Sequence, residues 1–206
     1  MKQGYFITFE GGDGSGKSTQ IKKLKAYLES RGFDVLLTRE PGGTRIGEKI
    51  RSIILDPENG EMSAMAEAML YAASRAQHVS EVIGPAIDAG KIVICDRFID
   101  SSIAYQGYGR SLGDSVSVIN SYAVDKYMPH MTFLLKLGPQ TGSRRIQGRQ
   151  KDRIELETAS FHQTVYDGYE ALERKYPDRI VGIDASRTIE EIEREIIRHI
   201  EGLLCR

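Results

Sequence analysis

A glycine-rich segment near the N-terminus has the residue types and spacing of a phosphate-binding loop. Residues 11–18 read GGDGSGKS and fit the pattern G-x-x-x-x-G-K-[ST] without a mismatch. An apolar run at 5–9 predicts a buried strand before the loop, and apolar residues recur at helical spacing after it. Such a turn between strand and helix points backbone N–H groups at an anion, so the segment predicts a nucleoside triphosphate site. The alternative, a glycine turn with a chance GKS, lacks support because both flanking elements are present.

The loop residues have expected contacts with a bound nucleotide. Lys17 is expected to reach the β- and γ-phosphates, and the Ser18 hydroxyl is expected to bind Mg²⁺. The predicted nucleotide-binding residues are Gly11, Gly12, Asp13, Gly14, Ser15, Gly16, Lys17, Ser18 and Thr19.

The composition excludes several other classes of protein. The 28 basic and 29 acidic residues leave a formal charge of −1, which argues against a general nucleic-acid surface. No apolar stretch is long enough to span a membrane, and the N-terminus has no signal-peptide pattern. The two cysteines, Cys95 and Cys205, are far apart, which offers no zinc site and fits a reducing cytoplasm. We therefore expect a cytoplasmic protein with no nucleic-acid or membrane partner.

Strand-like and helical segments alternate along the chain. The strand-like runs lie at 5–9, 34–38, 91–95, 131–137 and 179–183. Helical segments between them predict an α/β fold, with a five-stranded parallel sheet covered by helices on both faces. The segment 62–89 is expected to be helical with a break near Gly84-Pro85, and Thr188 with Glu191 predicts a capping box for the last helix. Ligands of such sheets gather at the carboxyl ends of the strands.

Two charged residues follow the third apolar run. Asp96 stands in the Walker B position, where a carboxylate holds Mg²⁺ or its water shell; an ordinary strand-end aspartate is the alternative. Arg97 comes next. In a phosphotransferase an arginine there bridges donor and acceptor phosphates, because transfer between two anions requires cations on both sides. The alternative for Arg97 is a surface ion pair.

Three further segments have a distinctive residue order. Residues 38–44 read TREPGGT, residues 70–75 read LYAASR and residues 96–107 read DRFIDSSIAYQG. Behind a complete phosphate loop, this order resembles the bacterial thymidylate (dTMP) kinase family over essentially the whole chain. The resemblance implies a single domain over 1–206, of the P-loop, nucleoside monophosphate kinase-like type, with a short lid at about 142–157. It also implies ATP and Mg²⁺ as cofactors and ATP-dependent phosphorylation of dTMP to dTDP.

The resemblance also implies which residues bind the acceptor. They are Asp13, Glu40, Arg51, Tyr71, Arg75, Arg97, Ser102, Tyr105 and Gln106. Arg51 and Arg97 would clamp the acceptor phosphate, because the planar guanidinium grips phosphate with two hydrogen bonds. Glu40 would support either the magnesium ion or the arginine cluster. Asp13 would contact the 3′-hydroxyl, and its alternative role is to stabilise the loop through an Asx turn.

The remaining acceptor residues would read the base and the sugar. Tyr71 would stack on thymine, and Arg75 would donate to its carbonyl edge. The alternatives are a core aromatic for Tyr71 and a solvated helix face for Arg75. Ser102 and Gln106 would complete the base-edge contacts, while Tyr105 would crowd the sugar 2′ position and favour deoxyribose.

A basic run coincides with the expected lid. It contains Arg144, Arg145, Arg149, Lys151 and Arg153. Some family members place an arginine in the phosphate loop, and others place the basic residue in the lid. Gly14 occupies the loop position, so this chain resembles the second group. The resemblance then implies that Arg149, Lys151 or Arg153 neutralises charge in the transition state. It also implies that Arg144 or Arg145 stacks on adenine. The alternative is a solvated charged face.

Two other functions and the assembly state remain open at this point. A deoxynucleoside kinase on the same scaffold would need a base for its hydroxyl acceptor, whereas Arg51 and Arg97 favour a monophosphate. A nucleotide-dependent switch would be expected to carry an N-K-x-D motif, and Asp125-Lys126 lacks the preceding Asn-Lys. Family members are commonly homodimers built from helices, so the resemblance implies a homodimer with the helix at 62–89 as a candidate interface.

Overall fold

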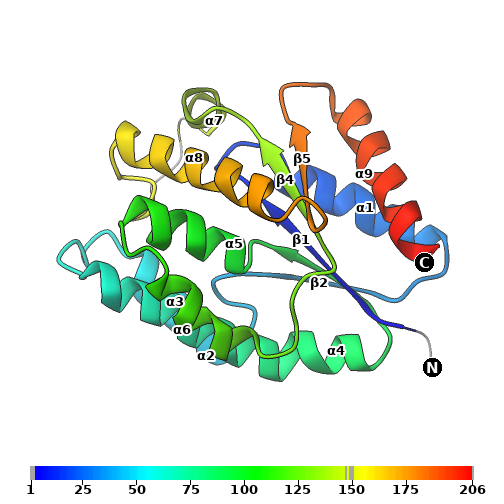
Figure 1. Cartoon of the computed structure of the whole chain (residues 1–206), viewed down its shortest axis with the longest axis horizontal. Helices are drawn as coiled ribbons and strands as arrows, with labels where there is room; N and C mark the ends of the chain where they lie inside the picture. Colours follow the sequence, from blue (N-terminus) through cyan, green and yellow to red (C-terminus); the bar gives the residue numbers. More distant parts are fainter. Residues whose placement is uncertain (1–2, 147, 149–150, 206) are drawn as a thin grey trace.

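A parallel sheet of five strands forms the centre of the molecule (Figure 1). The structure is a computed structural model that describes residues 3–146, 148 and 151–205. The strands are β1 (Tyr5–Glu10), β2 (Val35–Arg39), β3 (Ile92–Asp96), β4 (Met131–Lys136) and β5 (Ile180–Asp184). They are ordered β2-β3-β1-β4-β5, which confirms the predicted sheet and places the phosphate-loop strand in its middle.

The strands are buried on both sides, as their continuous apolar sequences require. In β1, Ile7 and Phe9 face α1 (Lys17–Ser30) and α9 (Ile189–Leu204), whereas Phe6 faces the opposite layer. That opposite layer contains α3 (Ala64–His78), α4 (Gly84–Asp88), α6 (Ser115–Val124) and α8 (Ala159–Lys175). The capping box predicted at Thr188 and Glu191 begins α9.

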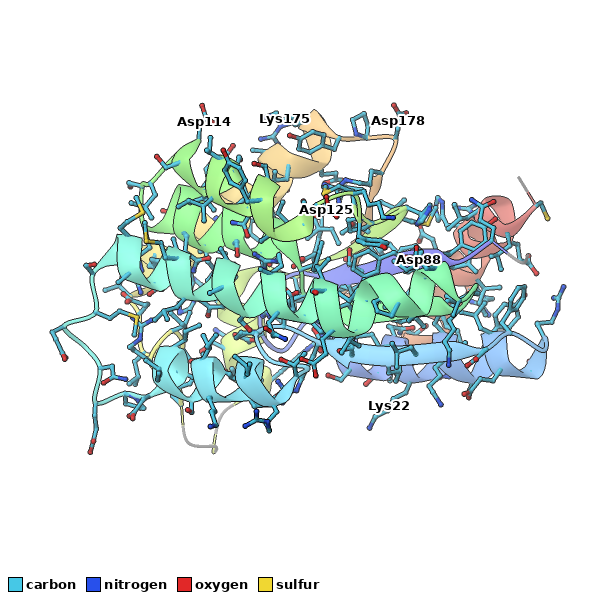
Figure 2. The ribbon with its side chains drawn as sticks, turned by 90° about the horizontal axis from the view of Figure 1, so that it is seen from below. Lys22, Asp88, Asp114, Asp125, Lys175 and Asp178 are labelled. Atoms are coloured by element: carbon cyan, nitrogen blue, oxygen red, sulfur yellow. The ribbon has the colours of Figure 1, made fainter. Side chains whose placement is uncertain are left out.

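The predicted break near Gly84-Pro85 was wrong. A π-helical segment, Val79–Ile83, joins α3 to α4, and the three form one rod across the molecule (Figure 2). Pro85 stands in the first turn of α4, directly after the π-helical segment. A Cβ at Gly84 would lie 2.8 Å from the Tyr127 ring, so this glycine permits close packing of the rod against the chain after α6.

The other elements lie around the carboxyl edge of the sheet. They are α2 (Arg45–Leu55), α5 (Ile99–Ser102), the π-helical segment Ile103–Gly109 and α7 (Pro139–Arg145). The described residues of the expected lid, 142–146, 148 and 151–157, form the end of α7 and turns before α8. In the described part of the chain, no helix combines the length and apolar character that crossing a bilayer requires.

Candidate active site

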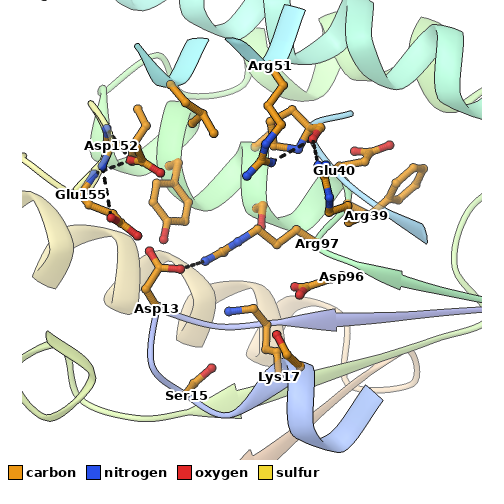
Figure 3. Close-up of a pocket in the computed structure, with 18 of the residues that line it drawn as sticks. Asp13, Ser15, Lys17, Arg39, Glu40, Arg51, Asp96, Arg97, Asp152 and Glu155 are labelled. Carbon is orange, nitrogen blue, oxygen red and sulfur yellow. Dashed lines mark hydrogen bonds and ion pairs between the residues drawn. The ribbon is translucent and has the colours of Figure 1, made fainter. Parts of the chain in front are cut away.

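A cavity of about 560 Å³ opens at the carboxyl ends of β1, β2 and β3 (Figure 3). Its walls come from the phosphate loop, α2, α3, the segment after β3 and the lid. The predicted site residues in the wall are Asp13, Gly14, Ser15, Gly16, Lys17, Ser18, Thr19, Glu40, Arg51, Tyr71, Arg75, Asp96, Arg97, Ser102, Tyr105, Gln106 and Arg145. Segments separated by more than a hundred residues therefore meet at the carboxyl ends of the strands, which is where folds of this kind bind their ligands.

The phosphate loop is closed by its own lysine. Lys17 Nζ donates to the carbonyl oxygens of Gly11 and Gly12 at 2.9 and 3.0 Å. Gly16 caps α1 in a left-handed conformation, with φ of 95°, which glycine adopts without a Cβ clash. Gly11 and Gly12 are outside the cavity wall and contribute backbone carbonyls instead.

The loop also touches the base of the lid through two glycines. A Cβ on Gly14 would lie 2.4 Å from the Gly142 carbonyl oxygen, and a Cβ on Gly142 would lie 2.3 Å from the Asp13 oxygen. Gly14 also has a φ of 76°, which disfavours other residues. The lid helix α7 can thus rest directly on the backbone of the phosphate loop.

Lys17 is buried among charges of both signs. Burial and the nearby Arg97 lower its pKa to about 8, against the opposing effects of Asp96, Asp13 and Glu10. A phosphate group beside the ammonium supplies negative charge and favours the protonated form. The environment of Lys17 is therefore suited to an anionic ligand.

Asp96 and Ser18 fit a magnesium ion. Asp96 Oδ1 is buried without a hydrogen-bond partner, and both residues line the cavity. Residues 3–146, 148 and 151–205 contain no group of three or more His, Cys, Asp or Glu side chains placed to hold a metal. Mg²⁺ in kinases characteristically uses one or two protein ligands and completes its shell with water and phosphate oxygens, so the Ser18 hydroxyl and the unpartnered Asp96 oxygen fit it.

Arg97 lies between the phosphate loop and the acceptor side (Figure 3). Its Nη2 donates to Asp13 Oδ1 at 2.8 Å, and its Nη1 donates to the hydroxyls of Ser101 and Tyr169. The guanidinium also lies over the Tyr105 ring, 5.4 Å from its centroid. Burial opposes the charge, but the surrounding oxygens outweigh it and raise the pKa of Arg97 above its usual value. Arg97 is therefore a fixed cation inside the cavity.

A buried glutamate supports Arg97 from below. Glu10 accepts hydrogen bonds from the Phe98 and Ser101 amides and from the hydroxyls of Ser101 and Tyr169. Burial, with a smaller contribution from Asp100, raises the pKa of Glu10 to about 7. Sequence reasoning missed Glu10, although a carboxylate ending an apolar strand beside the loop was a usable signal.

The acceptor side carries two arginines. Arg51 reaches down from α2, and its Nη1 donates to the Pro41 carbonyl at 2.9 Å (Figure 3). Arg39 Nη1 donates to the same oxygen at 3.0 Å. Burial and the adjacent Arg39 lower the pKa of Arg51, so negative charge is favourable at this wall. Arg39 was also missed; its position at the end of β2, directly before Glu40, was the signal.

Arg75 is held deep in the wall rather than on a solvated face, and only 1% of it is exposed. Its Nη atoms contact Ser102 Oγ, Asn120 Oδ1, the Phe98 carbonyl and Glu40 Oε2. Glu40 Oε1 also lies 3.0 Å from His78 Nδ1. Glu40 was expected to support either the magnesium ion or the arginine cluster, and its contact with Arg75 agrees with the second role. Ser102 and Arg75 both line the cavity, and Arg75 Nε is buried there without a hydrogen-bond partner.

The aromatic residues of the site come from α3 and from the π-helical segment after α5. Tyr71 is half-buried in the cavity wall. Tyr105 packs edge-on against Phe161 and Tyr169. This packing fixes the Tyr105 ring against the Arg97 guanidinium.

The basic run divides into residues inside and outside the cavity. Arg145 lines the cavity and donates to the Gly14 carbonyl at 3.3 Å. Arg144 and Lys151 are exposed and outside the cavity wall, and Arg149 lies outside the described residues. Arg153 does not face the cavity, in contrast to its expected role in the transition state. Its side chain is buried and donates to Glu67 and to the Ile54 carbonyl, both at 2.7 Å. Arg153 therefore anchors the lid to α2 and α3 instead of facing the cavity.

A phosphate loop, a strand-end aspartate and a second group of arginines around one cavity define a P-loop kinase of the nucleotide-phosphorylating class. A family model described as thymidylate kinase matches residues 9–196, and the chain belongs to this family. The chain is 51% identical over 207 residues to a thymidylate kinase of Geobacillus thermodenitrificans, covering 97% of this chain and 92% of that protein. It is 48% identical to the thymidylate kinase of Bacillus pumilus, with coverage of 98% and 97%.

A solved structure has the same fold. The thymidylate kinase of Ehrlichia chaffeensis superposes with a TM-score of 0.78 at 34% sequence identity, covering 96% of this chain and 99% of that one. The sheet and its helices are therefore those of the family.

Proposed function

We propose that the protein transfers the γ-phosphoryl group of ATP to the phosphate of dTMP, which yields ADP and dTDP. The position of Arg97 carries this proposal. It lies between the Lys17–Asp96 side of the cavity and the Arg51–Arg39 side, so one cation faces both anion sites (Figure 3). A nucleoside acceptor would offer no phosphate to this second group of arginines.

The reaction needs alignment and charge neutralisation. A dTMP phosphate oxygen, already ionised at neutral pH, attacks the γ-phosphorus, and the bond to the β–γ bridging oxygen breaks as ADP leaves. Lys17 and the loop amides hold the β- and γ-phosphates, Arg51 holds the acceptor phosphate, and Arg97 neutralises charge between them. A Mg²⁺ ion held by Ser18 and Asp96 would neutralise further phosphate charge when bound.

Arg145 is the lid cation that we propose for the donor side. It lines the cavity next to the phosphate loop, whereas Arg153 is engaged with Glu67. Its contact with the Gly14 carbonyl places it on the side where ATP binds. We also propose a cytoplasmic location, supported by the two widely separated cysteines, Cys95 and Cys205.

The proposed base site predicts an order of substrates. We expect kcat/KM to decrease from dTMP to dUMP, with dCMP, dAMP and ribonucleotides far lower. Loss of the thymine methyl removes one apolar contact of about 1–3 kcal/mol, so dUMP is reduced and not excluded. Arg75 only donates hydrogen bonds, so it opposes the cytosine amino group, and Tyr105 opposes a 2′-hydroxyl.

The measurement is ADP release in a coupled assay, at saturating Mg-ATP, for each monophosphate and nucleoside. A preference for dCMP, UMP or AMP would refute the proposed acceptor and leave the kinase scaffold standing. ADP release without any acceptor would support a nucleotide-dependent switch instead.

We further propose that the protein is a homodimer through α3 and α6. These helices pack side by side, and three large apolar residues remain exposed on them: Met69 at 55%, Val118 at 59% and Tyr122 at 84%. Exposed apolar groups of this size on adjacent helices are typical of protein interfaces.

Replacing Tyr122 with lysine is expected to convert the dimer into a monomer at micromolar concentration, because a charge would be buried in the interface. Light scattering on the wild-type and variant proteins measures this. Met128→Lys is the control, since Met128 is also exposed but lies beyond α6. A monomeric wild-type protein would contradict the proposal.

A further inference from the structure

A fully buried carboxylate in α3 links the base site to the lid. Glu67 is 0% exposed and accepts hydrogen bonds from three side chains. Gln106 Nε2 and Arg110 Nε donate to its Oε1 at 2.9 and 3.2 Å. Arg110 Nη2 and Arg153 Nη2 donate to its Oε2 at 3.0 and 2.7 Å. Both carboxylate oxygens are therefore occupied.

Glu67 fixes the orientation of the Gln106 amide. Burial alone would raise the pKa of Glu67, but the bonds from Arg110, Gln106 and Arg153 outweigh burial and hold it below its usual value. An ionised carboxylate only accepts hydrogen bonds, so the amide nitrogen of Gln106 must face it. The amide oxygen is then left for the cavity: Gln106 lines the wall, is 1% exposed, and its Oε1 is buried without a partner.

We propose that Glu67 is a positioning residue that sets the hydrogen-bonding polarity of the base site through Gln106. With the amide nitrogen held by Glu67, the site presents an acceptor, and it selects bases that carry an N–H at ring position 3. Thymine and uracil have this N–H, whereas cytosine presents a lone pair there and would leave two buried acceptors facing each other. This inference rests on the proposed dTMP kinase function.

The surroundings of Glu67 make the substitution Glu67→Gln informative. Two arginine donors meet at the Oε2 position, whereas Arg110 Nε and Gln106 meet at Oε1. Of these four donors only the Gln106 amide can turn over to accept a hydrogen bond, so the amide oxygen of the new side chain is expected at the Oε2 position. Its NH₂ group would then take the Oε1 position and donate to Gln106. The Gln106 amide would turn over and present its NH₂ group to the cavity, where it matches the N3 lone pair of cytosine.

The experiment compares kcat/KM for dTMP, dUMP and dCMP in wild-type protein and Glu67→Gln. The ratio of dTMP to dCMP is expected to fall at least tenfold, mainly through the KM for dTMP. The ratio of dTMP to dUMP should stay within about twofold, because it reports the thymine methyl and not the amide. Arg110→Met is the matched control, since it loosens the same cluster but leaves the bond between Glu67 and Gln106, and both ratios should be retained.

The proposal would be overturned if Glu67→Gln lowered the ratio of dTMP to dUMP as well as the ratio of dTMP to dCMP. It would also be overturned if Arg110→Met lowered the ratio of dTMP to dCMP equally. Either result would indicate a general loosening of the site. Wild-type turnover of dTMP tests the kinase function separately from these ratios.

A second measurement does not depend on the folding of a variant. In ¹⁵N-labelled wild-type protein, the Gln106 side-chain amide protons should be protected from exchange before and after dTMP binds, because they face Glu67. Protection that arises only when dTMP is added would mean that the NH₂ group faces the base, and the proposal would be wrong.

Discussion

Replacing Lys17 with alanine is expected to leave the fold intact and to lower kcat by on the order of a thousandfold or more. The ammonium group is placed among the loop carbonyls, beside Asp96 and below Arg97 (Figure 3). Its removal takes a positive charge from the transferring phosphoryl group in a buried site, where such charge acts strongly. The substitution removes the hydrogen bonds of Lys17 to the Gly11 and Gly12 carbonyls, but it also removes a buried charge whose burial lowers its pKa, so the two effects on stability oppose each other.

Single-turnover and steady-state kinetics with dTMP measure this effect, and circular dichroism verifies the fold. Lys25→Ala is the control on the same helix, because Lys25 makes only a half-exposed ion pair with Glu29. Turnover near that of the wild type in a folded Lys17→Ala protein would refute the phosphate-loop assignment.

The second large effect is a difference between the kinetic roles of Arg97 and Arg51. Arg97→Ala is expected to lower kcat by about a hundredfold or more, because the charge between the two phosphates acts in the transition state. Arg51→Ala is expected to raise the KM for dTMP by about ten- to a hundredfold while changing the KM for ATP little, because Arg51 lies on the proposed acceptor side of the cavity. Loss of a charge-assisted, bidentate hydrogen bond to phosphate is expected to weaken binding by this factor.

Two controls accompany these variants. Arg97→Lys keeps the charge without the planar fork and should recover only part of the lost turnover. Arg45→Ala changes an exposed arginine at the start of the same helix as Arg51 and should have no effect on either KM. The donor and acceptor sides are misassigned if Arg51→Ala raises the KM for ATP and leaves that for dTMP unchanged.

Local patterns were sufficient to predict the sheet and the phosphate loop. Strand-like runs of five to seven residues with helices between them allow few arrangements, and the loop pattern specifies its own strand and helix. The rod from α3 to α4 was harder, because a glycine and a proline in succession normally end a helix. The close packing of Tyr127 on Gly84, which spans 43 positions in the sequence, was not visible in the pattern.

The sequence could not predict which basic side chains face the cavity and which pair with buried carboxylates. Arg145 and Arg153 both belong to one basic run, yet the first lines the cavity and the second pairs with Glu67, 86 positions earlier. Arg75 is similar, since its burial depends on Glu40, Ser102 and Asn120 from three separate segments. Helical spacing identifies the side of a helix on which a residue lies, but only the tertiary fold supplies its partners.

The contact between Gly14 and Gly142 constrains how this enzyme can evolve. An arginine introduced at position 14 would collide with the Gly142 carbonyl oxygen, so it cannot be added while α7 rests on the loop. While α7 keeps this position, a cation at position 14 and the proposed lid cation, Arg145, are therefore alternatives in this chain. A side chain at position 14 therefore requires that α7 also move away from the loop.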